Sequence, residues 1–238
     1  MSSYYLKAII PLITMESVRR LHNGAKRDLI TRYTPPGSHV LDMGCGRGGD
    51  LRKWQPLTTR ICMGDPCAES VKDARQRAEG LGMNPRFFHG VIKDSPQEKF
   101  DVICFNFSLQ YVFVSRSEFI HTMVQIKNRS IPGTRVIGCI PDSDFILMHP
   151  KFKDKFENIF IRNKINTGEG KFGEKLQVCL AETPYYNGNF IAEPIAYKDI
   201  FITWMERSGF VLQEWAPLLA EETGTISDLY SKFCFLAV

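Results

Sequence analysis

The chain has 238 residues, 44% of them hydrophobic, and no proline-, serine- or charge-rich run divides it. We therefore expect one domain over 1–238, with an N-terminal helical segment at 1–36 and a core at 37–238. Its seven cysteines are odd in number, include no C-x-x-C pair and are scattered through apolar segments, so they imply neither disulfides nor zinc and favour a reducing, intracellular compartment. No signal peptide or membrane span is recognisable, and a net charge of +4 is too small to indicate a nucleic-acid partner by itself.

The first predicted helix covers residues 15–33. Its apolar residues recur at helical spacing, and Pro35-Pro36-Gly37 ends the segment. His22, Asn23 and Lys26 lie three and four residues apart, so they share one face of this helix. Such a face suits contacts with a ligand, and a solvated polar face has the same pattern.

A glycine-rich loop follows the first predicted strand. The stretch 40–50 runs from an apolar pair into an acid and then four glycines within six residues, which predicts a buried parallel strand and a tight loop, and Leu51 to Trp54 then begins a helix. Asp42 and Asp50 surround this loop with negative charge, although a pyrophosphate would need bare N–H groups and a positive dipole there. The loop therefore favours a cationic ligand, and S-adenosylmethionine is the common cofactor with that charge.

Polar residues also follow the next three predicted strands. The strand at 61–64 ends at Asp65, where an acid can accept from both ribose hydroxyls. The strand at 87–92 follows a helix at 69–79 and is ended by Asp94, which is placed to accept from an adenine amino group. The buried strand at 100–105 leads into Asn106, Ser108, Gln110 and Tyr111. Polar groups at the carboxyl ends of four strands indicate a ligand site in an open α/β sheet.

The rest of the chain is predicted to complete this sheet. We expect helices at 116–127 and 197–208, a fifth strand at 135–140, and strands at 174–181, 210–215 and 232–238 that add antiparallel edges. The expected fold class is α/β, a Rossmann-like S-adenosylmethionine-dependent methyltransferase. Its sheet would be mostly parallel and seven-stranded, with helices on both faces.

Four strings resemble the messenger RNA cap (guanine-N7) methyltransferases. They are HNGAK, VLDMGCGRGGDLRKW, FDVICFNFSLQY and LYSKFCF. The resemblance covers most of the chain, is most specific at the extension G-G-D-L-x-K-W, and is weakest over 142–191. The short N-terminal arm is similar to a viral or domain-sized version, such as the methyltransferase domain of a large DNA virus capping enzyme.

The resemblance implies two sets of binding residues. S-adenosylmethionine would be bound by Lys26, Asp42, Gly44, Gly46, Asp50, Asp65, Asp94, Asn106 and Tyr111. The cap would be bound by Asn23, by Arg47, Lys53 and Arg77 on the triphosphate, and by Gln110, Glu193 and Tyr230 around the guanine. The family usually has glutamine at the position of Asn106 and histidine at that of Gln110, whose amide can still donate to guanine O6.

The implied activity is methyl transfer to guanine N7 of the 5′ cap of mRNA. We name no catalytic residue and no metal, because N7 has an exposed lone pair and the sulfonium methyl is already activated. Glu193 lies between apolar residues at 191–192 and 194–196, which suits a buried carboxylate that accepts from the guanine edge. A strand-edge acid facing water is the alternative for Glu193, and ordinary solvated charge is the alternative for each of the three cations.

Two other functional classes stay open. One is a methyltransferase that acts on a small metabolite or a protein side chain, and the other is a catalytically silent subunit that binds a partner. For the cap enzyme, the expected partner is capped RNA, with other capping-enzyme domains or a stimulatory subunit as further candidates and no membrane. Its location would be the cytoplasm if viral and the nucleus otherwise.

Overall fold

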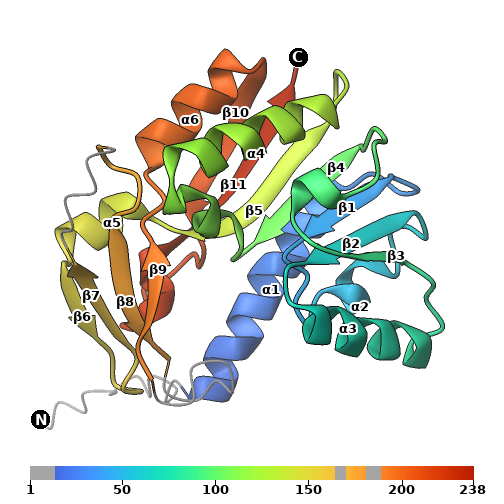
Figure 1. Cartoon of the computed structure of the whole chain (residues 1–238). Helices are drawn as coiled ribbons and strands as arrows, with labels where there is room; N and C mark the ends of the chain where they lie inside the picture. The colour runs from blue at the N-terminus through green and yellow to red at the C-terminus, as the bar shows by residue number, and fades with distance from the viewer. Residues whose placement is uncertain (1–13, 164–169, 181–188) are drawn as a thin grey trace, which may run out of the picture.

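A seven-stranded sheet forms the centre of the molecule (Figure 1). The computed structural model describes residues 14–163, 170–180 and 189–238, so residues 1–13 of the predicted N-terminal segment lie outside the described part. The strand order is β10-β11-β5-β4-β1-β2-β3, and only β11 runs against its neighbours. The strands are β1 (Val40–Met43), β2 (Ile61–Asp65), β3 (Arg86–His89), β4 (Val102–Asn106), β5 (Arg135–Pro141), β10 (Phe210–Pro217) and β11 (Tyr230–Ala237).

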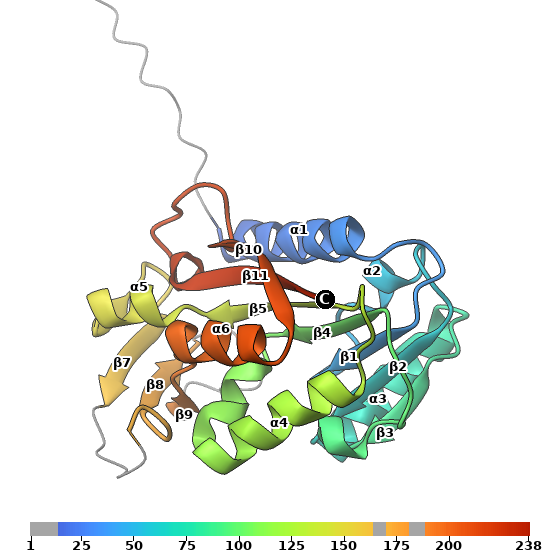
Figure 2. The same ribbon diagram turned by 90° about the horizontal axis from the view of Figure 1, so that it is seen from above.

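Helices cover both faces of this sheet. Figure 2 shows α1 on one face and α4 and α6 on the other. The strands between them are almost continuously apolar, and all residues of β1, β2 and β4 are buried, as expected for parallel strands covered on both sides. The predicted α/β architecture, a mostly parallel seven-stranded sheet with helices on both faces, is therefore confirmed. The helices are α1 (Met15–Tyr33), α2 (Leu51–Trp54), α3 (Ala68–Gly80), α4 (Arg116–Asn128) and α6 (Lys198–Arg207).

Helix α1 is attached to distant parts of the chain along its length. Near its middle, the His22 Nε2 atom lies 2.6 Å from the Ser227 hydroxyl. At its C-terminal end, Tyr33 donates to the Glu214 carboxylate on β10 over 2.8 Å, and Arg32 pairs with the same group. These contacts hold α1 across the face of the sheet, where its polar side chains reach the loops at the strand ends.

A second, four-stranded antiparallel sheet lies beside the main one. Its order is β6-β7-β8-β9, and it follows the short helix α5 (Ser143–Met148). The prediction that residues 174–181 complete the main sheet is therefore wrong, because this segment forms β8 and pairs with β7 and β9. Residue 181 lies outside the described part. The strands are β6 (Lys151–Lys153), β7 (Ile159–Asn163), β8 (Lys175–Cys179) and β9 (Ile191–Pro194).

The third strand is shorter than predicted. β3 ends at His89, and Gly90 then turns the chain with a φ of 142°. Residues 92–94 form a 3₁₀ turn in which an oxygen of Asp94 accepts from the Val91 backbone N–H over 3.0 Å. Asp94 therefore lies five residues beyond the strand, and the prediction that it ends the strand is wrong.

Asp142 connects β5 to both strands of the antiparallel edge. One of its carboxylate oxygens accepts from Trp215 Nε1 over 2.7 Å and from the Ser231 hydroxyl over 2.6 Å. The other accepts from the Asp144 backbone N–H, and the side chain is buried. A single carboxylate thus satisfies three donors where the chain leaves the main sheet.

Replacing Asp142 with alanine should destabilise the fold. The Trp215 and Ser231 donors would lose their acceptor, and the free energy of unfolding should fall by about 2–4 kcal/mol in urea titration. Asp144→Ala is the matched control, since its exposed pair with Lys198 is worth less than about 1 kcal/mol. Equal losses in the two variants would contradict this role of Asp142.

Candidate functional site

The glycine loop after β1 packs against the segment that follows β4. Gly44 has a φ of 73°, and a Cβ atom placed on it would lie 2.2 Å from Ser108 Cβ. Its backbone N–H donates to the Gly64 carbonyl over 2.8 Å. Gly46 also has a positive φ, of 50°. Only glycine fits at position 44, because the backbone there is left-handed and Ser108 leaves no room for a Cβ atom.

A buried carboxylate at Asp50 joins three elements beside this loop. The Lys26 and Lys53 ammonium groups each lie 2.7 Å from Asp50 Oδ1, and Asn106 Nδ2 donates to Oδ2 over 2.9 Å. Burial alone would raise the pKa of Asp50, but the two cations outweigh it and hold the pKa below its ordinary value. We call Lys26, Asp50, Lys53 and Asn106 the Asp50 cluster; it ties α1, α2 and β4 together.

Asp42 lies behind the Asp50 cluster at the end of β1. Its carboxylate is 2% exposed and accepts from Trp54 Nε1 over 2.9 Å. Burial, together with the nearby Asp50 charge, raises the pKa of Asp42 to about 7. Trp54, a partner that the sequence analysis did not assign, belongs to the same G-G-D-L-R-K-W string and fixes the acid in place.

Asn106 presents an acceptor that no described group satisfies. Its Nδ2 atom faces the Asp50 carboxylate, which can only accept, so the amide cannot turn round without setting two acceptors against each other. Its Oδ1 atom is buried and accepts no hydrogen bond. A buried acceptor without a donor is costly. The amino-acid ammonium of S-adenosylmethionine is a cationic donor that fits this oxygen beside Asp50.

Asp65 lies at the end of β2, next to the glycine loop. One of its oxygens accepts from the Gly46 backbone N–H and the other from the Cys67 N–H, each over 2.9 Å. Each carboxylate oxygen has a further lone pair, so these contacts orient Asp65 without using up its capacity as an acceptor. Asp94, after β3, is exposed. The roles of Asp65 and Asp94 on ribose and adenine stay predictions.

A second group of side chains surrounds Glu193 on β9. Glu193 is 3% exposed, which is inconsistent with a strand-edge acid facing water. Its oxygens accept from the Tyr111 hydroxyl over 3.2 Å and from Gln110 Nε2 over 3.4 Å. Burial and the Glu193 charge raise the pKa of Tyr230 far above its ordinary range. We call Gln110, Tyr111, Glu193 and Tyr230 the Glu193 cluster; Tyr111 was expected on the cofactor side.

Phe107 lies between the two clusters. It has a φ of 59°, which is rare for a bulky residue, and its ring stacks at 6.0 Å on His22 and meets Tyr230 edge-on at 5.3 Å. The Lys26 ammonium is 5.8 Å from the ring centroid. Burial and the Lys26 charge lower the pKa of His22 to about 4, so its imidazole is neutral at pH 7. The sequence analysis missed Phe107, whose signal was an aromatic residue between Asn106 and Ser108.

A pocket of about 500 Å³ opens between α1, the glycine loop and α3. It is lined by Asn23, Arg52 and Arg77 together with glycines of the loop. Arg77 donates to the Arg47 carbonyl over 3.2 Å, and the Arg47 side chain pairs with Asp73. Arg52 was missed, although it precedes Lys53 in the specific string. Lys53 itself is buried and donates to Asn23 Oδ1, so its ammonium belongs to the Asp50 cluster.

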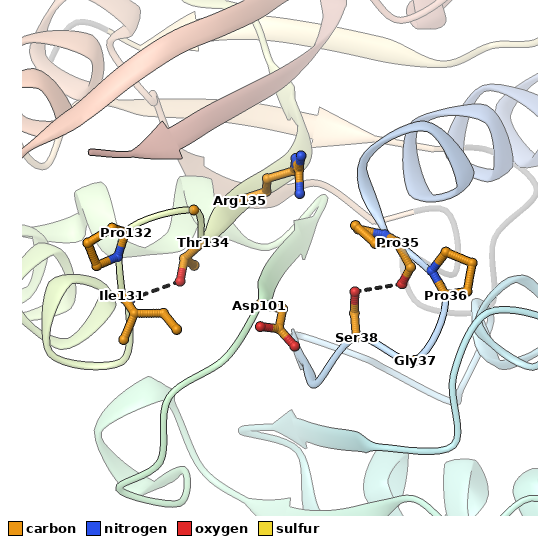
Figure 3. A pocket seen from close by; sticks show the side chains of 10 residues that line it. Pro35, Pro36, Gly37, Ser38, Asp101, Ile131, Pro132, Thr134 and Arg135 are labelled. Carbon is orange, nitrogen blue, oxygen red and sulfur yellow. Dashed lines mark hydrogen bonds between the residues drawn. The ribbon is translucent and has the colours of Figure 1, made fainter.

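Another pocket, of about 340 Å³, lies at the opposite, amino-terminal ends of β1, β4 and β5. Figure 3 shows Asp101 between a proline-rich turn at 35–38 and a turn at 131–135. None of the predicted site residues lines it. Ligands of open α/β sheets bind at the carboxyl ends of the strands, so we take the residues around Asp50 and Glu193 as the candidate functional site.

Three further observations concern the described residues. Within the ranges that the structure covers, no three His, Cys, Asp or Glu side chains gather in a way that suits a metal ion. Among the helices of those same ranges, none combines the length and apolar character needed to cross a membrane. The seven cysteines are all free thiols.

Comparison with known proteins identifies relatives of the chain. A family model for the mRNA (guanine-N(7))-methyltransferase domain matches residues 11–183. The mRNA cap guanine-N(7) methyltransferase of Schizosaccharomyces pombe is 33% identical over 164 residues, covering 62% of this chain and 44% of that protein. The protein of the same name from Eremothecium gossypii is 26% identical over 225 residues, covering 85% and 47%. The chain thus spans less than half the length of these relatives.

Solved structures share the architecture over nearly the whole chain. An S-adenosylmethionine-dependent methyltransferase from Clostridium acetobutylicum ATCC 824 superposes with a TM-score of 0.63 at 11% identity, covering 92% of this chain and 91% of that one. The glycopeptide N-methyltransferase MtfA, in complex with S-adenosylmethionine, gives 0.60 at 12% identity, covering 91% and 94%. At such identities the likeness shows the fold alone.

The raised pKa of Asp42 predicts a pH-dependent stability. The folded state holds this proton more tightly than the unfolded chain, so stability falls as pH rises from the ordinary carboxyl value of about 3.9 to about 7 and then levels off. Asp42→Asn keeps an acceptor for Trp54 and removes the titration. In urea unfolding, its stability relative to the unsubstituted protein should rise across that window. If the free energies of unfolding of Asp42→Asn and of the unsubstituted protein change in parallel from pH 4 to 8, the pKa of Asp42 is not raised.

Proposed function

Because the chain belongs to the mRNA (guanine-N(7))-methyltransferase family, we propose that it transfers a methyl group from S-adenosylmethionine to N7 of the guanine in the 5′ cap of mRNA. The observation that carries the proposal is the buried Glu193 carboxylate, next to the cofactor side of the site. A buried carboxylate that faces a ligand needs a partner with N–H donors, and the Watson–Crick edge of guanine supplies two side by side.

The cofactor side of the proposal rests on the Asp50 cluster and the glycine loop. S-adenosylmethionine would be held by the Asn106 amide oxygen at its ammonium, by Asp65 at its ribose and by the loop backbone at Gly44. When bound, it supplies an electrophilic methyl group on a sulfonium. The Asp50 carboxylate, which Lys26 and Lys53 already pair, would act by orienting the Asn106 amide so that its oxygen faces the cofactor ammonium.

The guanine side rests on the Glu193 cluster. One Glu193 oxygen accepts from the Tyr111 hydroxyl and the other from the Gln110 amide, and guanine N1–H and the exocyclic amine are the donors that would pair with this carboxylate in the complex. Phe107 and Tyr230 would supply aromatic surface for the flat base, because their rings meet edge-on at 5.3 Å beside Glu193. This arrangement distinguishes the proposal from a methyltransferase for a small metabolite, which needs no buried acid for a base edge.

The triphosphate side rests on the pocket between α1 and α3. Arg52 and Arg77 line it, and Arg47 lies beside Arg77. Exposed guanidinium groups suit phosphate oxygens because they donate several N–H bonds in one plane. Lys53 would act here through Asn23 and Asp50, which its ammonium holds in place. Capped RNA is the partner that we propose, in the nucleus or the cytoplasm.

The mechanism requires orientation and no acid–base group. Guanine N7 already carries an exposed lone pair, so no side chain has to remove a proton. The protein's residues hold the base and the cofactor in line and exclude water between them, an effect that can contribute about 7–11 kcal/mol. The neutral His22, which is stacked on Phe107, would help to fix the ring that separates the two clusters.

The proposal is tested by incubating the protein with labelled S-adenosylmethionine and GpppG-capped RNA, and by identifying the methylated base after nuclease digestion. Label in 7-methylguanosine is the expected result. Glu193→Gln sets an N–H against guanine, so kcat/KM for capped RNA should fall about 100-fold or more with unchanged S-adenosylhomocysteine affinity. Glu206→Gln, an exposed acid on α6, is the control. Label on a metabolite but not on capped RNA would refute the proposal.

A second measurement concerns the triphosphate. Arg77→Ala should raise the KM for capped RNA several-fold and leave the KM for S-adenosylmethionine unchanged, and added salt should weaken RNA binding in the same way. Arg75→Ala is the matched control, because Arg75 is on the same helix but lies over Phe87. If both arginine variants behave alike, the pocket does not hold the phosphates.

A further inference from the structure

The Gln110 amide has an orientation that its surroundings determine. Gln110 is 3% exposed and follows β4 in a 3₁₀ segment, Leu109–Val114. Its Nε2 atom donates to the Phe107 carbonyl over 3.1 Å and to Glu193 over 3.4 Å. Its Oε1 atom is buried and accepts no hydrogen bond. Both N–H groups of the amide are therefore directed at acceptors, while the oxygen has none of the donors that it needs.

Turning the amide round does not relieve this mismatch. The oxygen would then face the Phe107 carbonyl and the Glu193 carboxylate, and an amide oxygen, a carbonyl and a carboxylate are all acceptors. Gln110 thus presents an oxygen, and not an N–H, as its unused hydrogen-bonding group. This conflicts with the expected donation from Gln110 to guanine O6, because O6 is itself an acceptor and would repel Oε1.

Guanine has three hydrogen-bond donors, and one of them is left over for the Gln110 oxygen. Its donors are N1–H and the two hydrogens of the exocyclic amine, whereas O6, N3 and N7 are acceptors. Glu193 would take N1–H and one amine hydrogen in a bidentate pair. The second amine hydrogen is then without a partner on Glu193. Gln110, whose amide contacts Glu193, is the neighbouring side chain that could accept it.

We infer that Gln110 is a specificity-determining residue that accepts a hydrogen bond from the second hydrogen of the guanine exocyclic amine. The inference rests on the proposed function, and it assigns the amine to two residues and O6 to neither. A site built this way rejects bases that lack the amine, because Gln110 and Glu193 would both lose a partner. Such a site also rejects a guanine in which the second amine hydrogen is replaced by another group.

N2-methylguanosine-capped RNA is the probe that isolates this hydrogen. The base keeps N1–H and one amine hydrogen for Glu193 and lacks only the second. The unsubstituted protein should methylate it with a kcat/KM at least about tenfold below that for guanosine-capped RNA. Gln110→Leu and Gln110→Met remove the acceptor. In both variants the kcat/KM values for the two capped RNAs should lie within about threefold of each other, mainly because guanosine-capped RNA is methylated more slowly.

Two further arms decide between the outcomes. RNA capped with 6-thioguanosine changes only the O6 position, and its disadvantage relative to guanosine should be the same in the unsubstituted protein and in both variants. If the variants change the 6-thioguanosine ratio and leave the N2-methylguanosine ratio unchanged, Gln110 reads O6 and the inference is wrong. If neither the 6-thioguanosine ratio nor the N2-methylguanosine ratio differs between the unsubstituted protein and the variants, Gln110 only positions Glu193, and the inference is also wrong.

The proposed function fails in a different way from the inference. If the unsubstituted protein labels none of the three capped RNAs, the cap activity itself is wrong. If it labels guanosine-capped and N2-methylguanosine-capped RNA equally well, the cap activity stands and only the reading of the amine by Gln110 is lost. S-adenosylhomocysteine affinity, unchanged in both Gln110 variants, verifies that their fold and cofactor site are intact.

Discussion

The ion pairing around Asp50 is the constraint on which the site depends. One carboxylate holds the ammonium groups of Lys26 and Lys53 and the amide of Asn106, so it joins α1, α2 and the end of β4 in a single buried contact. Removing any one partner would leave charge or a donor unpaired in a region where that is costly. The same carboxylate orients Asn106, and the direction of that amide decides what kind of ligand atom the site accepts.

The two clusters are connected through the few residues after β4. Asn106 belongs to the Asp50 cluster, Phe107 separates the clusters, and Gln110 and Tyr111 belong to the Glu193 cluster. The strained backbone at Phe107 turns the chain between them. A displacement of β4 would therefore move both clusters together. This connection is a physical reason for expecting methyl donor and acceptor to be held in a fixed relation.

Parts of the molecule that depend on local pattern could be predicted from the sequence. Helix 15–33 has clear apolar spacing and a proline stop, and Glu193 has apolar neighbours that predicted its burial. The second sheet was not predicted, because an amphipathic strand such as β8 does not specify which partner it pairs with. Phe107 and the orientation of the Gln110 amide depend on tertiary contacts, and neither leaves a sequence signal beyond residue type.

The bond between His22 and Ser227 has a consequence for the order in which the site assembles. It closes a loop of 205 residues, whereas the Asp50 cluster needs only residues 26–106. Because chain entropy disfavours distant closures, contacts of low sequence separation form first during synthesis and refolding. The Asp50 cluster can thus take shape while the ribosome is still producing β9 and β11. The Glu193 cluster must wait for these strands, because Glu193 lies on β9 and Tyr230 on β11, so it is the last of the two clusters to form.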